Sequence, residues 1–221
     1  RLLEINLLND LGKHGEALSR LEKFILNSPG YPEARLIRAQ TLLRMGRTTE
    51  GWAEFDARWH VRKPVSPYLH QTIPSLKALG TKDGIVDQLL IWGEQGLGDH
   101  IMYLGYLETF VKLAVAKRIV VELDERLISL AETSFPSIEF TSDASQMYDE
   151  IDEQLPLGDL PKLLTEDSFD LVFPPFSAFL RVPQVNSDRF ARKIGVSWST
   201  SANFNSIGRS VSLDQLLEFV E

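Results

Sequence analysis

The chain contains no cysteine and only four histidines in 221 residues. Without cysteine it has neither disulfide bonds nor thiolate-bound metals. The histidines His14, His60, His70 and His100 show no spacing typical of zinc ligands. We therefore expect no zinc site. Our prediction for the chain includes no metal and no cofactor.

Long apolar runs are also lacking. No stretch approaches the ~20 residues that a helix needs to cross a bilayer, so we expect no membrane span. No secretory signal is visible, and the absence of cysteine is compatible with the cytoplasm, where we place the protein. The chain begins at Arg1 rather than methionine, so we expect a fragment.

Positive charge is scarce over most of the chain. Residues 64–221 carry 12 Lys and Arg against 23 Asp and Glu, whereas residues 1–63 carry 11 against 8, for a net charge of −8. An acidic body argues against nucleic-acid binding, which requires clustered Lys and Arg. We interpret the short basic stretch of Arg58, Arg62 and Lys63 as a solvated helix end.

Residues 1–63 contain an internal repeat. The pair Leu11-Gly12 recurs as Met45-Gly46, with helical periodicity between the two. The spacing from Gly12 to Gly46 is the length of one tetratricopeptide repeat. Such arrays commonly bind peptides or proteins, although a short array can also be only a structural brace. Helices are predicted over residues 1–11, 15–27, 32–45 and 48–62.

The remainder of the chain alternates between strand and helix patterns. Residues 64–87 are rich in proline and glycine and read as a linker. Strands are predicted over 89–92, 118–123, 137–141 and 193–198, and helices over 99–116, 124–133 and 212–220. Residues 146–153 are interpreted as a solvated acidic loop and 154–161 as a turn-rich loop. Alternating units of this size predict a Rossmann-like parallel sheet.

The stretch Leu89–Tyr103, LLIWGEQGLGDHIMY, has the order strand, glycine loop, helix. Ligands of open α/β sheets bind at such a loop. Its glycines allow positive φ and close approach of a ligand, and a helix beginning at Asp99 offers free N–H groups. The plainer interpretation of Asp99 is a helix N-cap. The glycine spacing matches neither the dinucleotide fingerprint nor a P-loop.

The run W-G-E-Q-G-L-G-D-x-I resembles the first loop in bacterial tetratricopeptide glycosyltransferases, relatives of the ADP-heptose heptosyltransferases and of the O-GlcNAc transferases. Matching segments occur at Gly51–Trp59, at 154–161, at Lys193–Trp198 and at Arg209-Ser210. The resemblance implies a GT-B fold with tetratricopeptide repeats at 1–63, a linker at 64–87, a Rossmann-like domain at 88–192 and an incomplete donor domain at 193–221.

The resemblance also implies roles for residues. Asp99 matches the carboxylate thought to act as general base on the acceptor hydroxyl. The acceptor-binding loop would be Glu94, Gln95, Gly96, Gly98 and His100, and the donor phosphates would face Ser197, Ser199, Asn203 and Arg209. From its position alone, Arg209 is a surface arginine near a helix start.

The implied function is metal-independent transfer of a sugar from a nucleotide sugar to a protein or glycan acceptor that the repeats recruit. Only the first strand and helix of the donor domain are present in the chain. A non-catalytic protein-binding adaptor is the alternative, and a nucleotide-binding regulator is a third. The apolar stripe of Trp52, Phe55 and Trp59 is predicted to join the repeats to the α/β domain.

Overall fold

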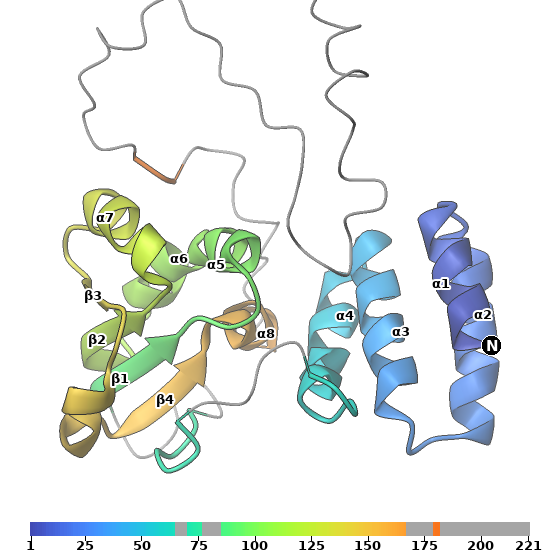
Figure 1. Ribbon diagram of the computed structural model, residues 1–221, viewed down its shortest axis with the longest axis horizontal. Coiled ribbons are helices and arrows are strands. Elements are labelled where there is room, and N and C mark those ends of the chain that lie inside the picture. Colours follow the sequence, from blue (N-terminus) through green and yellow to red (C-terminus); the bar gives the residue numbers. More distant parts are fainter. Residues whose placement is uncertain (65–69, 77–84, 167–178, 182–221) are drawn as a thin grey trace, which may run out of the picture. The chain divides into compact units, whose positions relative to one another are not determined.

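The computed structural model describes residues 1–64, 70–76, 85–166 and 179–181, all within a unit that spans Arg1–Pro183. Figure 1 colours these ranges by position in the sequence. The strand predicted over 193–198, the helix over 212–220 and the residues Ser197, Ser199, Asn203 and Arg209 lie outside the described residues.

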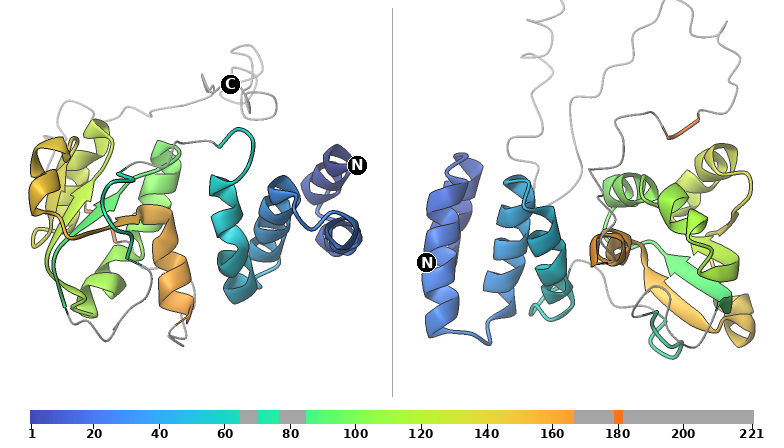
Figure 2. Two further views of the ribbon diagram at one scale, coloured as in Figure 1. Left: turned by 90° about the horizontal axis from the view of Figure 1, so that it is seen from below. Right: turned by 180° about the vertical axis from the view of Figure 1, so that it is seen from behind.

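The first part of the chain folds into two helical hairpins (Figures 1 and 2). The elements are α1 (Leu2–Asp10), α2 (His14–Asn27), α3 (Pro32–Arg44), α4 (Thr48–Glu54) and the 3-10 helix η1 (Phe55–Trp59). Three of the predicted helices are confirmed. The fourth is shorter than predicted, because the chain tightens into η1 after Glu54.

The internal repeat is visible in the backbone. Gly12 and Gly46 follow α1 and α3 with φ angles of +72° and +75°, a left-handed conformation that glycine adopts without strain. At both turns the next N–H reaches back to a leucine carbonyl: Lys13 to Leu8 at 2.8 Å and Arg47 to Leu42 at 3.0 Å. The two hairpins therefore begin with the same turn. The tetratricopeptide assignment itself stays a prediction.

The second part contains a four-stranded sheet in the order β3-β2-β1-β4. The strands are β1 (Val86–Trp92), β2 (Ala116–Glu122), β3 (Glu139–Thr141) and β4 (Glu153–Pro156). Every pairing is parallel. This confirms the predicted α/β class with a parallel sheet. The last four residues of β1 are fully buried, as expected for an inner strand.

Two hydrophobic clusters cover the faces of the sheet. Leu89, Ile91 and Val121 face the large cluster that contains the helices α5 (Leu97–Leu104), α6 (Leu107–Lys112), α7 (Glu125–Ser134) and α8 (Leu160–Glu166). Leu90 and Val120 point to the opposite face, where a smaller cluster includes residues next to the 3-10 helix η2 (Ser145–Glu150). Side chains alternate between faces along each strand, as a pleated backbone requires.

The single helix predicted over 99–116 is wrong, because the chain forms α5 and α6 with a break between them. At the break the N–H groups of Gly105 and Tyr106 donate to the carbonyls of Met102 and Tyr103, three residues back. Glycine is a poor helix former, and the tight turn re-aims the chain. Leu107 and Phe110 are fully buried as a result.

The segment predicted as a loop over 154–161 is also wrong. It forms most of β4, the 3-10 helix η3 (Leu157–Asp159) and the start of α8. The prolines of this segment led us to predict turns. In the structure Pro156 is the last residue of β4, and Pro161 lies in the first turn of α8. The missing proline N–H costs nothing there. The acidic residues Asp149 and Glu150 are exposed in η2, which agrees with a solvated segment.

Part of the predicted linker runs beside the sheet. Ser75 and Gln154 form an isolated parallel bridge. The N–H of Leu76 donates to the Gln154 carbonyl at 2.9 Å, and the N–H of Gln154 donates to Pro74 at 2.8 Å. Ile73 and Leu76 are buried. The described residues 70–76 are therefore an ordered addition to the edge at β4.

The aromatic stripe after the hairpins joins them to the sheet region. Trp52 and Phe55 belong to the same hydrophobic cluster as the sheet, and the Trp52 ring lies 6.2 Å from the Tyr103 ring of α5. The Trp59 ring lies 5.8 Å from that of Trp92 in β1. These contacts confirm the predicted role of the stripe. Within the described ranges, no helix has the length and apolarity of a membrane span.

Candidate functional site

The strand order places the candidate loop at a reversal point of the sheet. From β1 the chain proceeds to β2 and β3 on one side, whereas β4 pairs with the other side of β1. Ligands of open α/β sheets bind beyond the carboxyl ends of the strands at such a point. Here those ends are followed by Gly93–Gly96 after β1 and by Leu157–Asp159 after β4.

Asp99 holds the start of α5, but not as its N-cap. Gly96 is the N-cap, and Asp99 is the third helical residue. Its Oδ2 accepts the N–H of Gly96 at 3.0 Å, and its own N–H donates to the Gly96 carbonyl at 2.9 Å. This is the acidic half of a capping box. The predicted helix start at Asp99 was two residues late.

The Asp99 carboxylate is only partly committed to this cap. The side chain is half-buried, and among the described residues its Oδ1 accepts no hydrogen bond. One oxygen is thus fixed by the backbone, while the other is available to a ligand hydroxyl.

The glycines of the loop do not supply the left-handed conformation that we predicted. That conformation belongs to Gln95, with φ +68°, while Gly96 is extended with φ −118°. Gly93 allows a close approach to the backbone, but the approaching group is the His100 side chain rather than a ligand. A Cβ at Gly93 would lie 2.3 Å from Cε1 of His100. Gly98 has open space around its Cα on the side where a Cβ would point.

His100 is part of the wall of the site. It is 8% exposed, and its ring lies against the backbone of Gly93. Burial lowers the pKa of the imidazole, against the opposing charges of Asp124 and Asp99, so the neutral form is favoured. A buried neutral ring in this position supports the loop. Its role as an acceptor contact stays a prediction.

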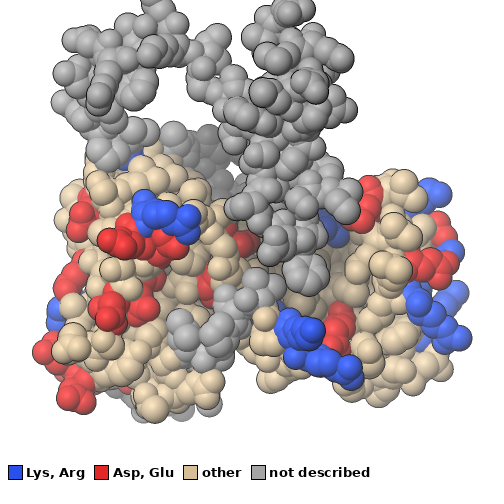
Figure 3. All heavy atoms as spheres, in the orientation of Figure 1, with Lys and Arg blue, Asp and Glu red and all other residues tan. Residues whose placement is uncertain are grey.

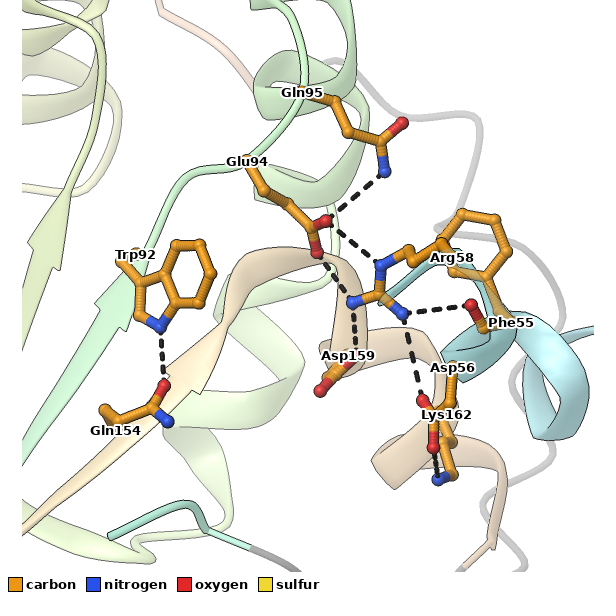
Figure 4. A network of polar contacts seen from close by, with 9 residues as sticks. All are labelled: Phe55, Asp56, Arg58, Trp92, Glu94, Gln95, Gln154, Asp159 and Lys162. Carbon is orange, nitrogen blue, oxygen red and sulfur yellow. Dashed lines mark hydrogen bonds and ion pairs between the residues drawn. The ribbon is translucent and has the colours of Figure 1, made fainter. Parts of the chain in front are cut away.

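Glu94 is engaged by an arginine from η1, as Figure 4 shows. Arg58 donates from Nε to Oε2 at 3.0 Å and from Nη2 to Oε1 at 2.7 Å. The two side chains are 6% and 1% exposed. Glu94 is therefore occupied by Arg58 within the protein, and its role as an acceptor contact stays a prediction. Arg58, interpreted from sequence as part of a solvated helix end, is buried.

The guanidinium of Arg58 has further partners. Its Nη2 also donates to Oδ1 of Asp159 at 2.5 Å, and its Cζ lies 4.7 Å and 4.3 Å from the ring centroids of Phe55 and Trp59. Cation–π contacts of this kind are strongest when they are desolvated. We call Arg58, Glu94 and Asp159 the buried charge cluster.

Gly158 makes the buried charge cluster possible. A Cβ at this position would lie 2.4 Å from Oε1 of Glu94 and 3.4 Å from Nη2 of Arg58. Because glycine has no side chain, the Glu94 carboxylate, which follows β1, can pack against the backbone at Gly158, which follows β4. Sequence reasoning missed Arg58, Gly158 and Asp159. The available indication was an arginine between two aromatic residues of an apolar stripe.

The buried charge cluster holds one guanidinium between two carboxylates. Burial raises the pKa of Asp159 to about 6, although the charge of Arg58 opposes this. The pKa of Arg58 is also raised: burial would lower it, but Asp159 and Glu94 outweigh that effect. Because desolvation outweighs the attraction of Arg58, Asp159 gains a proton more easily than a free aspartate does.

An Asp159→Asn variant tests this asymmetry. The folded pKa of about 6 exceeds the usual 3.8, so ionised Asp159 disfavours the folded state above pH 6, and its protonation removes that penalty as the pH falls. We expect the variant to gain about 1–2 kcal/mol of unfolding free energy at pH 7.5 and nothing at pH 4. Urea unfolding at both pH values measures this. Asp149→Asn, an exposed acid, is the control, and equal gains in both variants would contradict the assignment.

A second set of contacts lies on the other side of Trp92. Its indole N–H donates to Oε1 of Gln154 at 2.5 Å, and Gln154 donates to Oγ of Ser75 at 2.8 Å. His70 hydrogen-bonds the hydroxyl of Tyr148, and its ring lies 5.6 Å from that of Trp92. Through these contacts the described linker residues His70 and Ser75 pack against the end of β1 and its neighbours.

A small pocket adjoins the loop. Its volume is about 80 Å³, well below the ~300 Å³ at which small-molecule sites begin, so a nucleotide sugar does not fit in it. Its walls come from α3, η1 and the loop: Leu36, Gln40, Phe55, Arg58, Trp59, Val61, Lys63, Glu94 and Gln95.

The described surface drawn in Figure 3 shows no broad clustering of positive charge, as the acidic composition leads us to expect. In Figure 3 the described Lys and Arg side chains are interspersed with Asp and Glu, and no broad basic patch covers this face. In the described part of the chain no three His, Asp or Glu side chains gather as metal ligands would.

Comparison with known proteins finds a relative of part of the chain. No protein-family model matches the chain, and no solved structure matches it. The chain is 32% identical over 145 residues to Protein FlbA of Caulobacter vibrioides, an alignment that covers 63% of this chain and 24% of FlbA. The matched part of this chain thus corresponds to about a quarter of the length of that relative.

Proposed function

We propose that the chain belongs to a glycosyltransferase and supplies its acceptor side, with transfer from a nucleotide sugar to a protein or glycan hydroxyl. The observation that carries the proposal is the Asp99 carboxylate beyond the end of β1. One of its oxygens is fixed by the Gly96 N–H at 3.0 Å. The other accepts no hydrogen bond from the described residues.

This arrangement suits a general base. As the acceptor oxygen forms its bond to the sugar, its proton passes to the Asp99 carboxylate, and the nucleotide phosphate leaves with the electron pair of the broken bond. Because the Gly96 N–H fixes the orientation of the carboxylate, little reorganisation accompanies the proton transfer. The donor-facing roles of Ser197, Ser199, Asn203 and Arg209 rest on the sequence resemblance.

The test is an Asp99→Asn substitution in the full-length protein. The asparagine oxygen still accepts the Gly96 N–H, so α5 begins as before, but the base is lost. Transfer from a panel of nucleotide sugars to the acceptor proteins of a cell lysate is expected to fall at least ~100-fold. The measurement is incorporation of radiolabelled sugar.

Asp10→Asn is the matched control, since Asp10 is an exposed acid at the end of α1 and its loss should leave transfer unchanged. A variant at Asp99 that transfers at the wild-type rate would contradict the assignment. Nucleotide binding without transfer by the wild-type protein would reject the enzyme.

A protein-binding adaptor is the second candidate. It is favoured by a groove of about 390 Å³ between α3 and the residues that follow η1. Glu33, Leu36, Ile37 and Gln40 line it from one face of α3, at the spacing of successive helical turns. In an adaptor, Asp99→Asn would leave partner binding intact, whereas filling the groove with Ile37→Trp would abolish it.

A further inference from the structure

The protein's own guanidinium occupies the reversal point of the sheet. Arg58 comes from η1, Glu94 follows β1 and Asp159 follows β4, so the buried charge cluster ties the helical segment to both strand ends (Figure 4). In other open α/β sheets this is the place of a ligand. A change in the position of η1 would therefore act directly on Glu94, which belongs to the same loop as Asp99.

The contact between Arg58 and Glu94 is rigid. Two parallel hydrogen bonds fix the carboxylate in the plane of the guanidinium. The rings of Phe55 and Trp59 hold the guanidinium from the side of η1. Since both charged groups are almost fully buried, separating them would leave an uncompensated charge in the interior.

A short series of contacts leads from Glu94 to Asp99. Gln95 adopts the left-handed conformation directly after Glu94, and its Nε2 lies 3.4 Å from Oε2 of Glu94. Gly96 follows as the N-cap of α5, and its N–H holds Oδ2 of Asp99. A displaced Glu94 would release the strained turn at Gln95, and with it the cap.

We infer that Arg58 is a positioning residue: through Glu94 it holds the Gly93–Asp99 loop in the conformation that presents Asp99. Its consequence for sugar transfer rests on the proposed function, whereas the control of the loop does not. The helical segment is thereby coupled to the candidate site, because movement of η1 moves the guanidinium.

The experiment compares Arg58→Lys with the wild type by amide hydrogen exchange. Lysine keeps the charge but cannot form the two parallel bonds to Glu94 while also bonding Asp159. The amides of Gly96, Asp99 and His100 are expected to exchange ~10-fold faster, because the loop opens locally. The amides of Val120 and Val121 in β2, which report global unfolding, should change much less.

Arg38→Lys is the matched control. Arg38 is partly buried and pairs with Glu54 inside the helical segment. This variant should leave loop exchange at the wild-type rate. If Arg58→Lys leaves loop exchange unchanged, or accelerates the loop and β2 equally, the positioning role is overturned.

Transfer kinetics give a second readout. If the full-length protein transfers sugar, Arg58→Lys should lower kcat about 10-fold and leave the KM for the donor unchanged, since the inference gives Arg58 a role in positioning the loop of Asp99 and none in donor binding. Unchanged kcat would overturn the link to catalysis. The exchange measurement needs no donor, so a wild-type protein without transfer activity would reject the proposed function while the positioning role is still decided by the exchange rates.

Discussion

A Gly93→Ala substitution is expected to lower the free energy of unfolding by about 3 kcal/mol, the upper part of the usual range for overpacking. The added methyl group would lie 2.3, 2.6 and 2.8 Å from the Cε1, Nε2 and Nδ1 atoms of His100. The imidazole is buried at 8% exposure, so it cannot swing aside without disturbing the loop. Urea denaturation followed by circular dichroism measures the loss.

Gly98→Ala is the matched control in the same loop. Outside the adjacent residues and the backbone of its own helix, no heavy atom lies within 4 Å of the added methyl group. The position is already inside α5, where alanine is favoured over glycine. We expect no loss, and a gain of up to about 1 kcal/mol. Equal losses in the two variants would show that backbone freedom, rather than the contact with His100, explains the glycine at 93.

The sequence predicts those parts of the fold whose cause is local. The hairpins follow from helical periodicity and from the recurrence of Gly12 as Gly46, and these two glycines share the same left-handed φ. The apolar β-branched strand over 118–123 is present as β2. These elements depend on short-range patterns, which a sequence displays directly.

The strand β4 escapes the same reasoning. It has four residues and ends in Pro156, so neither alternation nor length distinguishes it from a turn. What makes it a strand is its pairing with β1, which lies much earlier in the chain: Leu89 pairs with Glu153 and Trp92 with Pro156. Tertiary pairing decides its conformation, and the sequence of the segment does not reveal it.

The candidate site also has one part that local sequence predicts and one part that only the tertiary structure reveals. The loop that carries Asp99 is recognisable because strand, glycines and helix follow one another within the single stretch Leu89–Tyr103. The buried charge cluster is assembled from separations of 36 and 101 residues, and charged side chains are normally solvated. Only the position of Arg58 between Phe55 and Trp59, in an otherwise apolar stripe, points to its burial.

Trp52→Ala is expected to lower the free energy of unfolding by about 3–5 kcal/mol, the range for truncating a buried aromatic side chain. Trp52 is 6% exposed. Its ring lies 5.2 Å from that of Phe55 and 6.2 Å from that of Tyr103, so it contacts both η1 and α5. The cavity would therefore open where the helical hairpins share a core with the sheet, and it would weaken the coupling between them.

Two probes measure this coupling. Hydrogen exchange of the amides of the buried residues Leu18 and Leu21 in α2 reports the hairpins, and exchange of the buried β2 amides reports the sheet. In the wild type both should give one transition, because Trp52 and Val121 belong to one hydrophobic cluster. In Trp52→Ala the two transitions are expected to separate, with the hairpins unfolding at lower urea concentration.

Tyr31→Ala is the matched control, because it removes an aromatic ring that packs on Phe24 inside the helical segment and is 44% exposed. We expect a loss below about 1 kcal/mol and coincident transitions, since truncation of a half-exposed side chain leaves little cavity. A single unshifted transition in Trp52→Ala would contradict the role of the stripe as the joint between hairpins and sheet. Loss of the Trp52 contacts would also allow η1 to move, and Arg58 would then lose its fixed position against Glu94 in the loop of Asp99.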